Sequence, residues 1–253
     1  ISVGAALFKK VNRKKGIVVA NIGDASMACG PVWEGLAFAT MDQYNELWEG
    51  DMKGGLPLIV NIMNNQYGMG GQTCGETMGY EVAARIGAGL NKDQMHAERV
   101  DGYNPLAVID AYKRKRKIIE EKRGPVLLDV LTYRYSGHSP SDASSYRSKE
   151  EVEAWEKQDS IVWFGSELVK AGVATPEELE AIKSKTVGLI TSSLQLAIDA
   201  EVSPHMDLKK YPNMIGEMMI RNQTGANMED RPEEVNTRME ETTRVKHLAT
   251  HER

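Results

Sequence analysis

Two apolar runs that end abruptly in polar residues constrain the fold of this chain more than any other feature. The first, at 17–22, is followed by Gly23-Asp24, and the second, at 58–63, is followed by Asn64-Asn65 and a glycine-rich turn. Strands that are apolar at nearly every position are typical of a parallel sheet covered by helices on both faces. Helix-like segments separate the runs, and this alternation predicts an α/β fold with a doubly wound, mostly parallel sheet.

Hydrophobic periodicity and helix-capping signals predict the remaining elements. We expect further strands at 99–101 and 125–135, and helices at about 1–11, 30–41, 78–90, 104–124, 149–171 and 176–202. Segment 42–55 is expected to be a solvent-exposed insertion. The basic cluster 113–117 is expected to be a solvated helix face rather than an anion site. The inward positions of that helix would be Leu106, Ile109, Ala111, Ile118 and Ile119.

The chain has 253 residues, and its regular pattern fades beyond about 203. We therefore expect an α/β domain at 1–203 and a charged extension or linker toward a partner at 204–253. The net charge of −5 gives no support for nucleic-acid binding. We expect no membrane span, because no apolar run is long enough. The start at Ile1, within a helix-like pattern, suggests a piece of a longer protein.

The polar residues at the strand ends predict a site for a metal and an anion. Ligands in such sheets bind at the carboxyl ends of the strands, where Asp24, Asn65 and the loop after Tyr135 all fall. Carboxylate, amide and backbone oxygens suit Mg²⁺, and the N–H groups that open a helix after Asp24 suit a diphosphate. The alternative is that Asp24 caps a helix and Asn64-Asn65 mark a turn. Neither the glycine pattern of dinucleotide-binding folds nor a P-loop is present.

Several motifs together resemble a known family. Gly23-Asp24 and the segment 64–69, NNQYGM, resemble the thiamine-diphosphate motif. The segments RVDGYNPLAV (99–108) and GPVLLDVLTYRYSGHSPSDASSYRSKEEV (124–152) extend the match. Over about residues 1–200 the chain resembles the α subunit of the E1 component of 2-oxo acid dehydrogenase complexes. The resemblance implies a thiamine-diphosphate-binding fold with a C-terminal helical extension.

The resemblance also implies roles for individual residues. Mg²⁺ would be held by Asp24, Asn65 and the backbone carbonyl of Tyr67, and the diphosphate would meet the N–H groups of Ala25 and Ser26. At Ala25 the family usually has glycine, so this contact depends on a negative φ there.

The long polar loop carries the other implied roles. His138 would be the catalytic residue and would reach the cofactor from this loop, which Arg134 and Asp142 would order. Ser139 and Ser145 stand where mitochondrial members are phosphorylated, and a phosphate at Ser139 would place negative charge beside the diphosphate site.

The activity that the resemblance implies is the oxidative decarboxylation of a 2-oxo acid, with acyl transfer to a lipoyl group. Its partners would be an E1 β subunit or fused β region, as in an α₂β₂ assembly, and the lipoyl domain of E2. The compartment would be the bacterial cytoplasm, which we favour, or the mitochondrial matrix. Three alternatives stay open: an acetoin dehydrogenase, another thiamine-diphosphate enzyme of transketolase type, which the loop at 133–142 disfavours, and a non-catalytic α-like interaction subunit.

Overall fold

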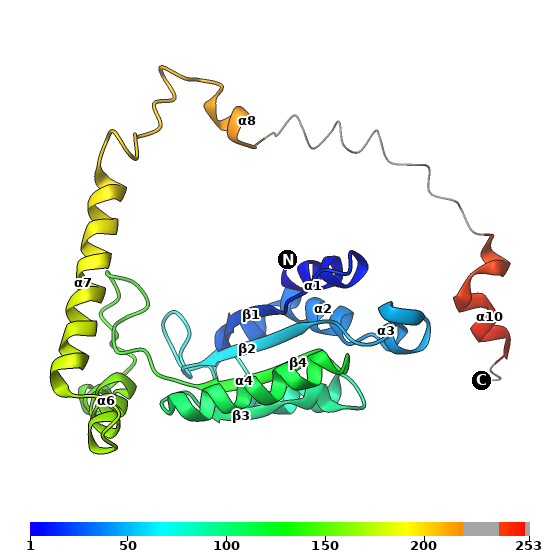
Figure 1. The fold of residues 1–253 in the computed structure, drawn as a ribbon, viewed down its shortest axis with the longest axis horizontal. Helices are drawn as coiled ribbons and strands as arrows, with labels where there is room; N and C mark the ends of the chain where they lie inside the picture. Colours follow the sequence, from blue (N-terminus) through cyan, green and yellow to red (C-terminus); the bar gives the residue numbers. More distant parts are fainter. Residues whose placement is uncertain (220–237, 251–253) are drawn as a thin grey trace. The chain divides into compact units, whose positions relative to one another are not determined.

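The computed structural model describes residues 1–219 and 238–250 (Figure 1). The chain divides into two compact units, Ile1–Glu167 and Leu168–Arg253. The first unit contains the sheet and every residue expected at the site. The boundary expected near 203 stays a prediction, and part of the expected extension lies outside the described residues.

A four-stranded parallel sheet forms the centre of the first unit, which confirms the expected fold class. Its order is β1-β2-β4-β3. The strands are β1 Val18–Gly23, β2 Leu58–Asn64, β3 Glu98–Asp101 and β4 Val126–Leu131. The register pairs Gly23 with Met63 and Asn64 with Leu131. The carboxyl ends of β1, β2 and β4 therefore lie at one edge.

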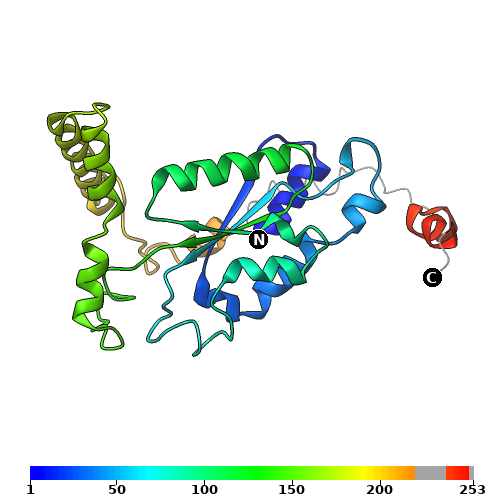
Figure 2. The same cartoon turned by 90° about the horizontal axis from the view of Figure 1, so that it is seen from below.

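Helices cover both faces of this sheet (Figure 2). On one face, Leu58, Val60 and Ile62 pack in a cluster with residues of α1 (Ser2–Val11), α2 (Gly30–Ala39) and the 3₁₀ helix η3 (Ala83–Gly89). On the other face, Ile59 and Leu128 pack with residues of α4 (Pro105–Glu120). Because side chains alternate along a strand, a strand buried on both faces must be apolar at nearly every position. This explains the run at 58–63.

Two expected helices differ in the structure. The helix expected at 78–90 is the shorter 3₁₀ helix η3. The helix expected at 149–171 is broken into α5 (Lys149–Glu156) and α6 (Ser160–Lys170). Asp159 causes this break, because its carboxylate accepts hydrogen bonds from the N–H groups of Ile161 and Val162 and so starts a new helix.

The insertion expected to be solvent-exposed is partly buried, so this expectation was wrong. Tyr44, in α3 (Gln43–Glu46), is 4% exposed and belongs to the main core cluster. Its ring packs edge-on against Phe38 and Trp48, with centroids 6.3 and 5.4 Å apart. A short 3₁₀ helix, η2 (Gly50–Met52), follows before β2. The aromatic residues of the insertion thus extend the core at one end of α2.

The expected faces of α4 also need correction. Leu106 and Ile109, expected to be inward, are 59% and 50% exposed, whereas Ala111 and Ile119 are buried as expected. Lys115, expected on a solvated face, is buried. Its ammonium group donates to the carbonyl of His96 and lies 3.4 Å from a carboxylate oxygen of Glu98. These polar partners are what make a buried lysine tolerable.

The second unit begins within α6 and continues with α7 (Pro176–Ile198). Thr175 and Glu178 form the capping box that the sequence TPEELE indicates. The further described elements are α8 (Met214–Met219), η5 (Met239–Glu241) and α10 (Thr243–Thr250). Across the described residues of both units, no helix is long and apolar enough to cross a membrane.

Candidate functional site

Asp24 begins the 3₁₀ helix η1 (Asp24–Ala28), directly after β1. Its carboxylate is 1% exposed and accepts a hydrogen bond of 2.6 Å from the hydroxyl of Thr73. The backbone N–H groups of Ala25 and Asn65 also donate to it. The structure thus brings Asp24 to the turn after β2, where the other expected metal ligands lie.

Burial raises the pKa of Asp24, although its hydrogen bonds act in the opposite direction. Within residues 1–219 and 238–250, no lysine, arginine or histidine forms an ion pair with it. A buried carboxylate without a counter-charge is costly, and a bound cation removes this cost. The electrostatics at this strand end therefore favour a cation.

The two asparagines at the end of β2 make different contacts. Asn64 is buried, its side-chain N–H donates to Asp129 at 2.8 Å, and its side-chain oxygen accepts from the N–H of Gln66 at 3.3 Å. Asn65 is half-buried, and its side-chain oxygen accepts a hydrogen bond of 2.9 Å from the N–H of Tyr67. The chain then turns back, and Tyr67 pairs with Gln72 in an antiparallel bridge. This turn holds Asn65 and Tyr67 beside Asp24.

The residues expected at the diphosphate lie next to this turn. Ala25 and Ser26 are half-buried in η1, and a Cβ on Gly68 would lie 3.5 Å from the methyl group of Ala25. Ala25 is not among the residues with positive φ. Alanine therefore adopts this backbone without strain, although its N–H group here donates to Asp24.

Asp142 is the centre of the hydrogen bonds within the polar loop 136–148. It accepts from the N–H groups of His138 and Ser144, at 2.7 and 2.9 Å, and from the hydroxyl of Tyr146 at 2.7 Å. These bonds, that of His138 first, lower the pKa of Asp142 to about 2. The carboxylate therefore ties together residues from both halves of the loop.

Arg134 connects this loop to the turn after β2. Its guanidinium donates to the carbonyl of Gly68 at 3.0 Å and to the hydroxyl of Tyr146 at 2.9 Å. It also lies 3.3 Å from Nδ1 of His138, whose side chain is exposed. Because a guanidinium only donates, Nδ1 is the acceptor, and the proton of a neutral imidazole is on Nε2. Arg134 therefore links His138 to the turn after β2.

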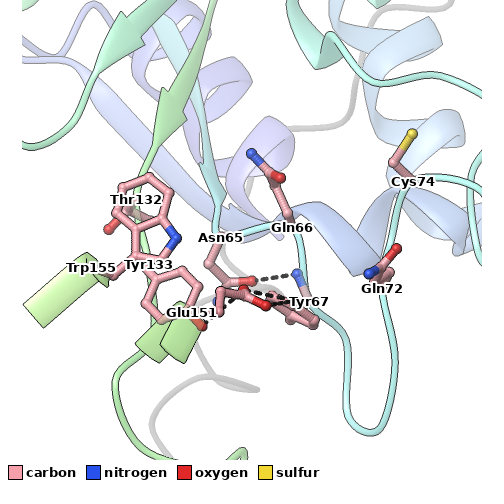
Figure 3. Close-up of a pocket in the computed structure, with 9 residues that line it drawn as sticks. All are labelled: Asn65, Gln66, Tyr67, Gln72, Cys74, Thr132, Tyr133, Glu151 and Trp155. Atoms are coloured by element: carbon pink, nitrogen blue, oxygen red, sulfur yellow. Dashed lines mark hydrogen bonds between the residues drawn. The ribbon is translucent and has the colours of Figure 1, made fainter. Parts of the chain in front are cut away.

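Tyr67 and Tyr133 share one carboxylate, that of Glu151 in α5. The hydroxyl of Tyr67 lies 2.8 and 3.0 Å from its two oxygens, and the hydroxyl of Tyr133 lies 3.0 Å from one of them (Figure 3). The guanidinium of Arg147 lies 5.6 Å from the ring of Tyr67 and 5.4 Å from that of Tyr133. These side chains join α5 to the turn after β2.

A cavity of about 120 Å³ opens beside this junction (Figure 3). Its lining includes Asn65, Gln72, Tyr133, Glu151 and Trp155. The lining is mostly polar, and the side chains come from the turn after β2, the end of β4 and α5. The cavity thus adjoins the expected metal ligands.

Ser139 and Ser145 are both exposed and outside these contacts with the turn. The hydroxyl of Ser139 lies 3.1 Å from that of Ser141. Their accessibility is compatible with modification, and phosphorylation stays a prediction.

Sequence reasoning missed two residues of this site. Thr73, which binds Asp24, lies in a glycine-rich segment with no periodic pattern. Glu151 lies within segment 124–152, to which the resemblance extends, but it received no role there, and acids are common in the first turn of a helix. No sequence signal indicates that it contacts a tyrosine that is 84 positions away.

The donor set fits the group that the resemblance implies. The oxygens of Asp24, Asn65 and Tyr67 are hard ligands of the kind that Mg²⁺ prefers. Across the described residues, no cluster of three or more histidine, cysteine, aspartate or glutamate side chains could hold a metal ion, and this donor set has one carboxylate together with an amide and a carbonyl oxygen. The uncompensated carboxylate of Asp24 is the observation on which this fit depends.

The chain is similar to known proteins over most of its length. The model of the family "Dehydrogenase E1 component" matches residues 1–205. A probable pyruvate dehydrogenase E1 component subunit alpha, mitochondrial, from Caenorhabditis elegans is 30% identical over 206 residues, covering 81% of this chain and 47% of that protein. The pyruvate dehydrogenase E1 component subunit alpha of Rickettsia conorii is 29% identical over 197 residues, covering 78% of this chain and 56% of the relative.

The chain thus spans about half the length of the curated relatives that it matches. The type I mitochondrial α subunit of Ascaris suum gives the same picture, with 30% identity over 210 residues, 81% of this chain and 48% of that protein. With a family model that matches 205 of its residues, this chain belongs to the dehydrogenase E1 component family, and the relatives described here are its α subunits.

Proposed function

We propose that this chain is part of an E1 α component that binds thiamine diphosphate and Mg²⁺ and acts on a 2-oxo acid. The complete enzyme would decarboxylate the acid oxidatively and transfer the acyl group to the lipoyl domain of an E2 component. It would require a β subunit or a fused β region. The buried carboxylate of Asp24, uncompensated among the described residues and hydrogen-bonded to Asn65, is the observation that carries the proposal.

In this proposal the strand ends bind the cation. Asp24, the side-chain oxygen of Asn65 and the carbonyl of Tyr67 hold Mg²⁺, which neutralises the diphosphate. The N–H groups at Ala25 and Ser26, in the first turn of η1, would meet the diphosphate, and the N–H of Ala25 would have to give up its hydrogen bond to Asp24 to do so. The bound cofactor supplies the carbon nucleophile and the electron sink for cleaving the bond between the carbonyl carbon and the carboxylate.

In this proposal, the imidazole of His138 donates a hydrogen bond to the substrate. With Nδ1 accepting from Arg134, the neutral imidazole carries its proton on Nε2. This N–H can donate to an oxygen of the substrate on which negative charge develops. The hydrogen bonds of Asp142 and Arg134 keep the loop in one conformation, so the imidazole is positioned before the substrate binds.

The names of the relatives make pyruvate the first 2-oxo acid to test. Those names include a mitochondrial protein and bacterial ones, so the bacterial cytoplasm and the mitochondrial matrix both stay predictions for this chain.

Calorimetric titration of thiamine diphosphate into the full-length protein with its β partner, with and without Mg²⁺, tests the proposal. We expect tight binding only with Mg²⁺, and its loss in Asp24→Asn. The control is Asp101→Asn, which changes an exposed carboxylate at the end of β3. If wild type does not bind the cofactor, the enzymatic proposal fails, and a non-catalytic interaction subunit is the better description. If Asp24→Asn binds as tightly as wild type, Asp24 is not a metal ligand.

A further inference from the structure

Tyr67 is held by three contacts, two of its backbone and one of its side chain. Its N–H donates to the side chain of Asn65 at 2.9 Å, its backbone pairs with Gln72, and its hydroxyl binds the carboxylate of Glu151. The side chain is only 7% exposed. The carbonyl proposed to bind Mg²⁺ belongs to this same residue. The hydrogen bond of the hydroxyl to Glu151 therefore also helps to fix the position of this proposed metal ligand.

The turn that contains Tyr67 has other anchors as well: the N–H of Thr73 donates to the carbonyl of Gln66 at 2.9 Å, and Arg134 donates to the carbonyl of Gly68 at 3.0 Å. Its tip closes with a hydrogen bond of 2.9 Å from the N–H of Gly68 to the carbonyl of Gly71. Met69 at the tip is 75% exposed. Gln66 has a φ of 65°, a conformation that side-chain-bearing residues rarely adopt and that its surroundings must enforce. The hydrogen bond from the hydroxyl of Tyr67 to Glu151 is therefore one of several contacts that place this turn.

Glu151 is itself fixed in place. Its N–H donates to the hydroxyl of Ser148, which caps α5. Four residues later on the helix, Trp155 stacks on the ring of Tyr133, with centroids 5.0 Å apart and planes 11° from parallel. The hydroxyl of Tyr133 in turn donates to Glu151. The carboxylate is therefore a rigid acceptor, because the helix that carries it is packed against the end of β4.

We propose that Glu151 is a positioning residue, which holds the Mg²⁺ ligands of the turn after β2 in place through the hydroxyl of Tyr67 (Figure 3). This inference rests on the proposed function, because it assumes that Asn65 and Tyr67 bind the cation. Glu151 contacts neither substrate nor cation in this role. Its contribution is to metal affinity, and the loss of that contribution is compensated by a higher concentration of Mg²⁺.

Glu151→Gln and Tyr67→Phe, alone and combined, test this inference in the full-length protein with its β partner. The measurement is the Kd of Mg²⁺ by calorimetry at saturating thiamine diphosphate. Groups that orient metal ligands typically contribute 10- to 100-fold in affinity, and we expect each single variant to weaken Mg²⁺ by about tenfold. Both substitutions act on the same contact, Glu151→Gln by removing the charge of the acceptor and Tyr67→Phe by removing the donor, so the double variant is expected to be no weaker than the weaker single variant.

Glu150→Gln is the matched control, since it removes the same charge from the neighbouring, exposed position of α5. It is expected to leave the affinity for Mg²⁺ unchanged. A raised Mg²⁺ concentration is expected to restore cofactor binding to Glu151→Gln, which a general loss of structure would not allow. Melting curves of each variant show whether it folds, and Tyr67→Phe tests the same contact if Glu151→Gln does not.

The outcomes separate the two proposals. If wild type shows no Mg²⁺-dependent cofactor binding, the proposed function fails, and this inference fails with it. If wild type binds but Glu151→Gln and Tyr67→Phe bind Mg²⁺ as tightly as Glu150→Gln, only the role of Glu151 is overturned. Additive losses in the double variant would also overturn it, because the two residues would then act independently.

Discussion

Asn64 and Asn65 show how two identical neighbours come to differ in purpose. Asn64 is the last residue of β2 and points into the sheet interior, toward Asp129. Asn65 lies beyond the strand and points toward the turn. Both side-chain oxygens accept from N–H groups of the turn, that of Asn64 from Gln66 at 3.3 Å and that of Asn65 from Tyr67 at 2.9 Å, whereas the amide of Asn64 also donates to Asp129. The resemblance selects Asn65 from the sequence, and the structure adds that Asn64 is bound to Asp129.

Asp142 is expected to control the order of the polar loop in a pH-dependent manner. Its pKa falls from 3.8 to about 2 in the folded protein. A lowered pKa means that the ionised form stabilises the fold, so the contribution is complete above about 4 and is lost as the pH falls toward 2. At neutral pH, Asp142→Asn is expected to remove this stabilising contribution. Hydrogen exchange at the N–H groups of His138 and Ser144 would then be several-fold faster than in wild type.

Ser141→Ala serves as the control for this measurement, because it changes the same loop without touching the carboxylate. Unchanged exchange in Asp142→Asn would show that other contacts, such as those of Arg147 with the carbonyls of Arg134 and Ser136, order the loop.

At the scale of elements, apolar runs predict the strands, and capping signals predict where helices begin. The strands and α2, α4 and α7 begin within a residue or two of their expected positions, because burial and caps are local properties of the sequence. The missed features depend on distant partners. The burial of Lys115 requires Glu98 on a neighbouring strand, and the burial of Tyr44 requires Phe38 and Trp48. Such contacts leave no periodic signal.

Lys115 in α4 is expected to be important for stability, unlike the other lysines of its cluster. Lys115→Ala removes a buried side chain together with its ion pair, and we expect a loss of about 2–3 kcal/mol in the free energy of unfolding. Lys113→Ala, at an exposed position on the same helix, is expected to change it by less than about 0.5 kcal/mol. Urea denaturation of both variants measures the difference, and equal effects would contradict the buried pairing.

The connection from the insertion to β2 is expected to tolerate no side chain at Gly55. A Cβ there would fall on the carbonyl oxygen of Gly124, in the turn before β4. Gly55→Ala is therefore expected to cost about 3 kcal/mol or more, because backbone must shift to admit it. Gly70→Ala, where a Cβ would meet open space, is the comparison. Similar melting temperatures for the two variants would show that this close approach is absent in solution.

At the scale of the whole first unit, Asp129 in β4 is bound by residues of β2, β3 and η3. It is fully buried and accepts from Asn64 at 2.8 Å, from the N–H of Ala84 at 3.2 Å and from Arg99 at 2.8 Å. Asp129→Ala leaves these donors without their acceptor, and we expect a loss of about 3–5 kcal/mol. Asp101→Ala, at an exposed strand end, is the control. Guanidinium-induced unfolding compares them, and a loss below about 1 kcal/mol for Asp129→Ala would contradict a central role.

The sequence predicts which strand ends meet at the candidate site, but it does not predict all of the residues that surround them. A parallel sheet places the ends of β1 and β2 at one edge, and the structure brings Asp24 and Asn65 together there. The binding roles of these residues stay proposals. Thr73 and Glu151 could not be predicted, because their places follow from the path of a turn and from the docking of α5. Both depend on side-chain packing between segments far apart in the chain.

The wide spacing of the site residues has a consequence for the order of events during folding. Asp24 meets Thr73 across 49 positions, and Tyr67 meets Glu151 across 84. Contacts of such high sequence separation form slowly, because the entropy of closing long loops is lost before they are made. No short peptide from this chain contains a complete ligand set. In the proposed function, the cation would therefore not nucleate the fold but would bind late, to molecules whose sheet has already assembled.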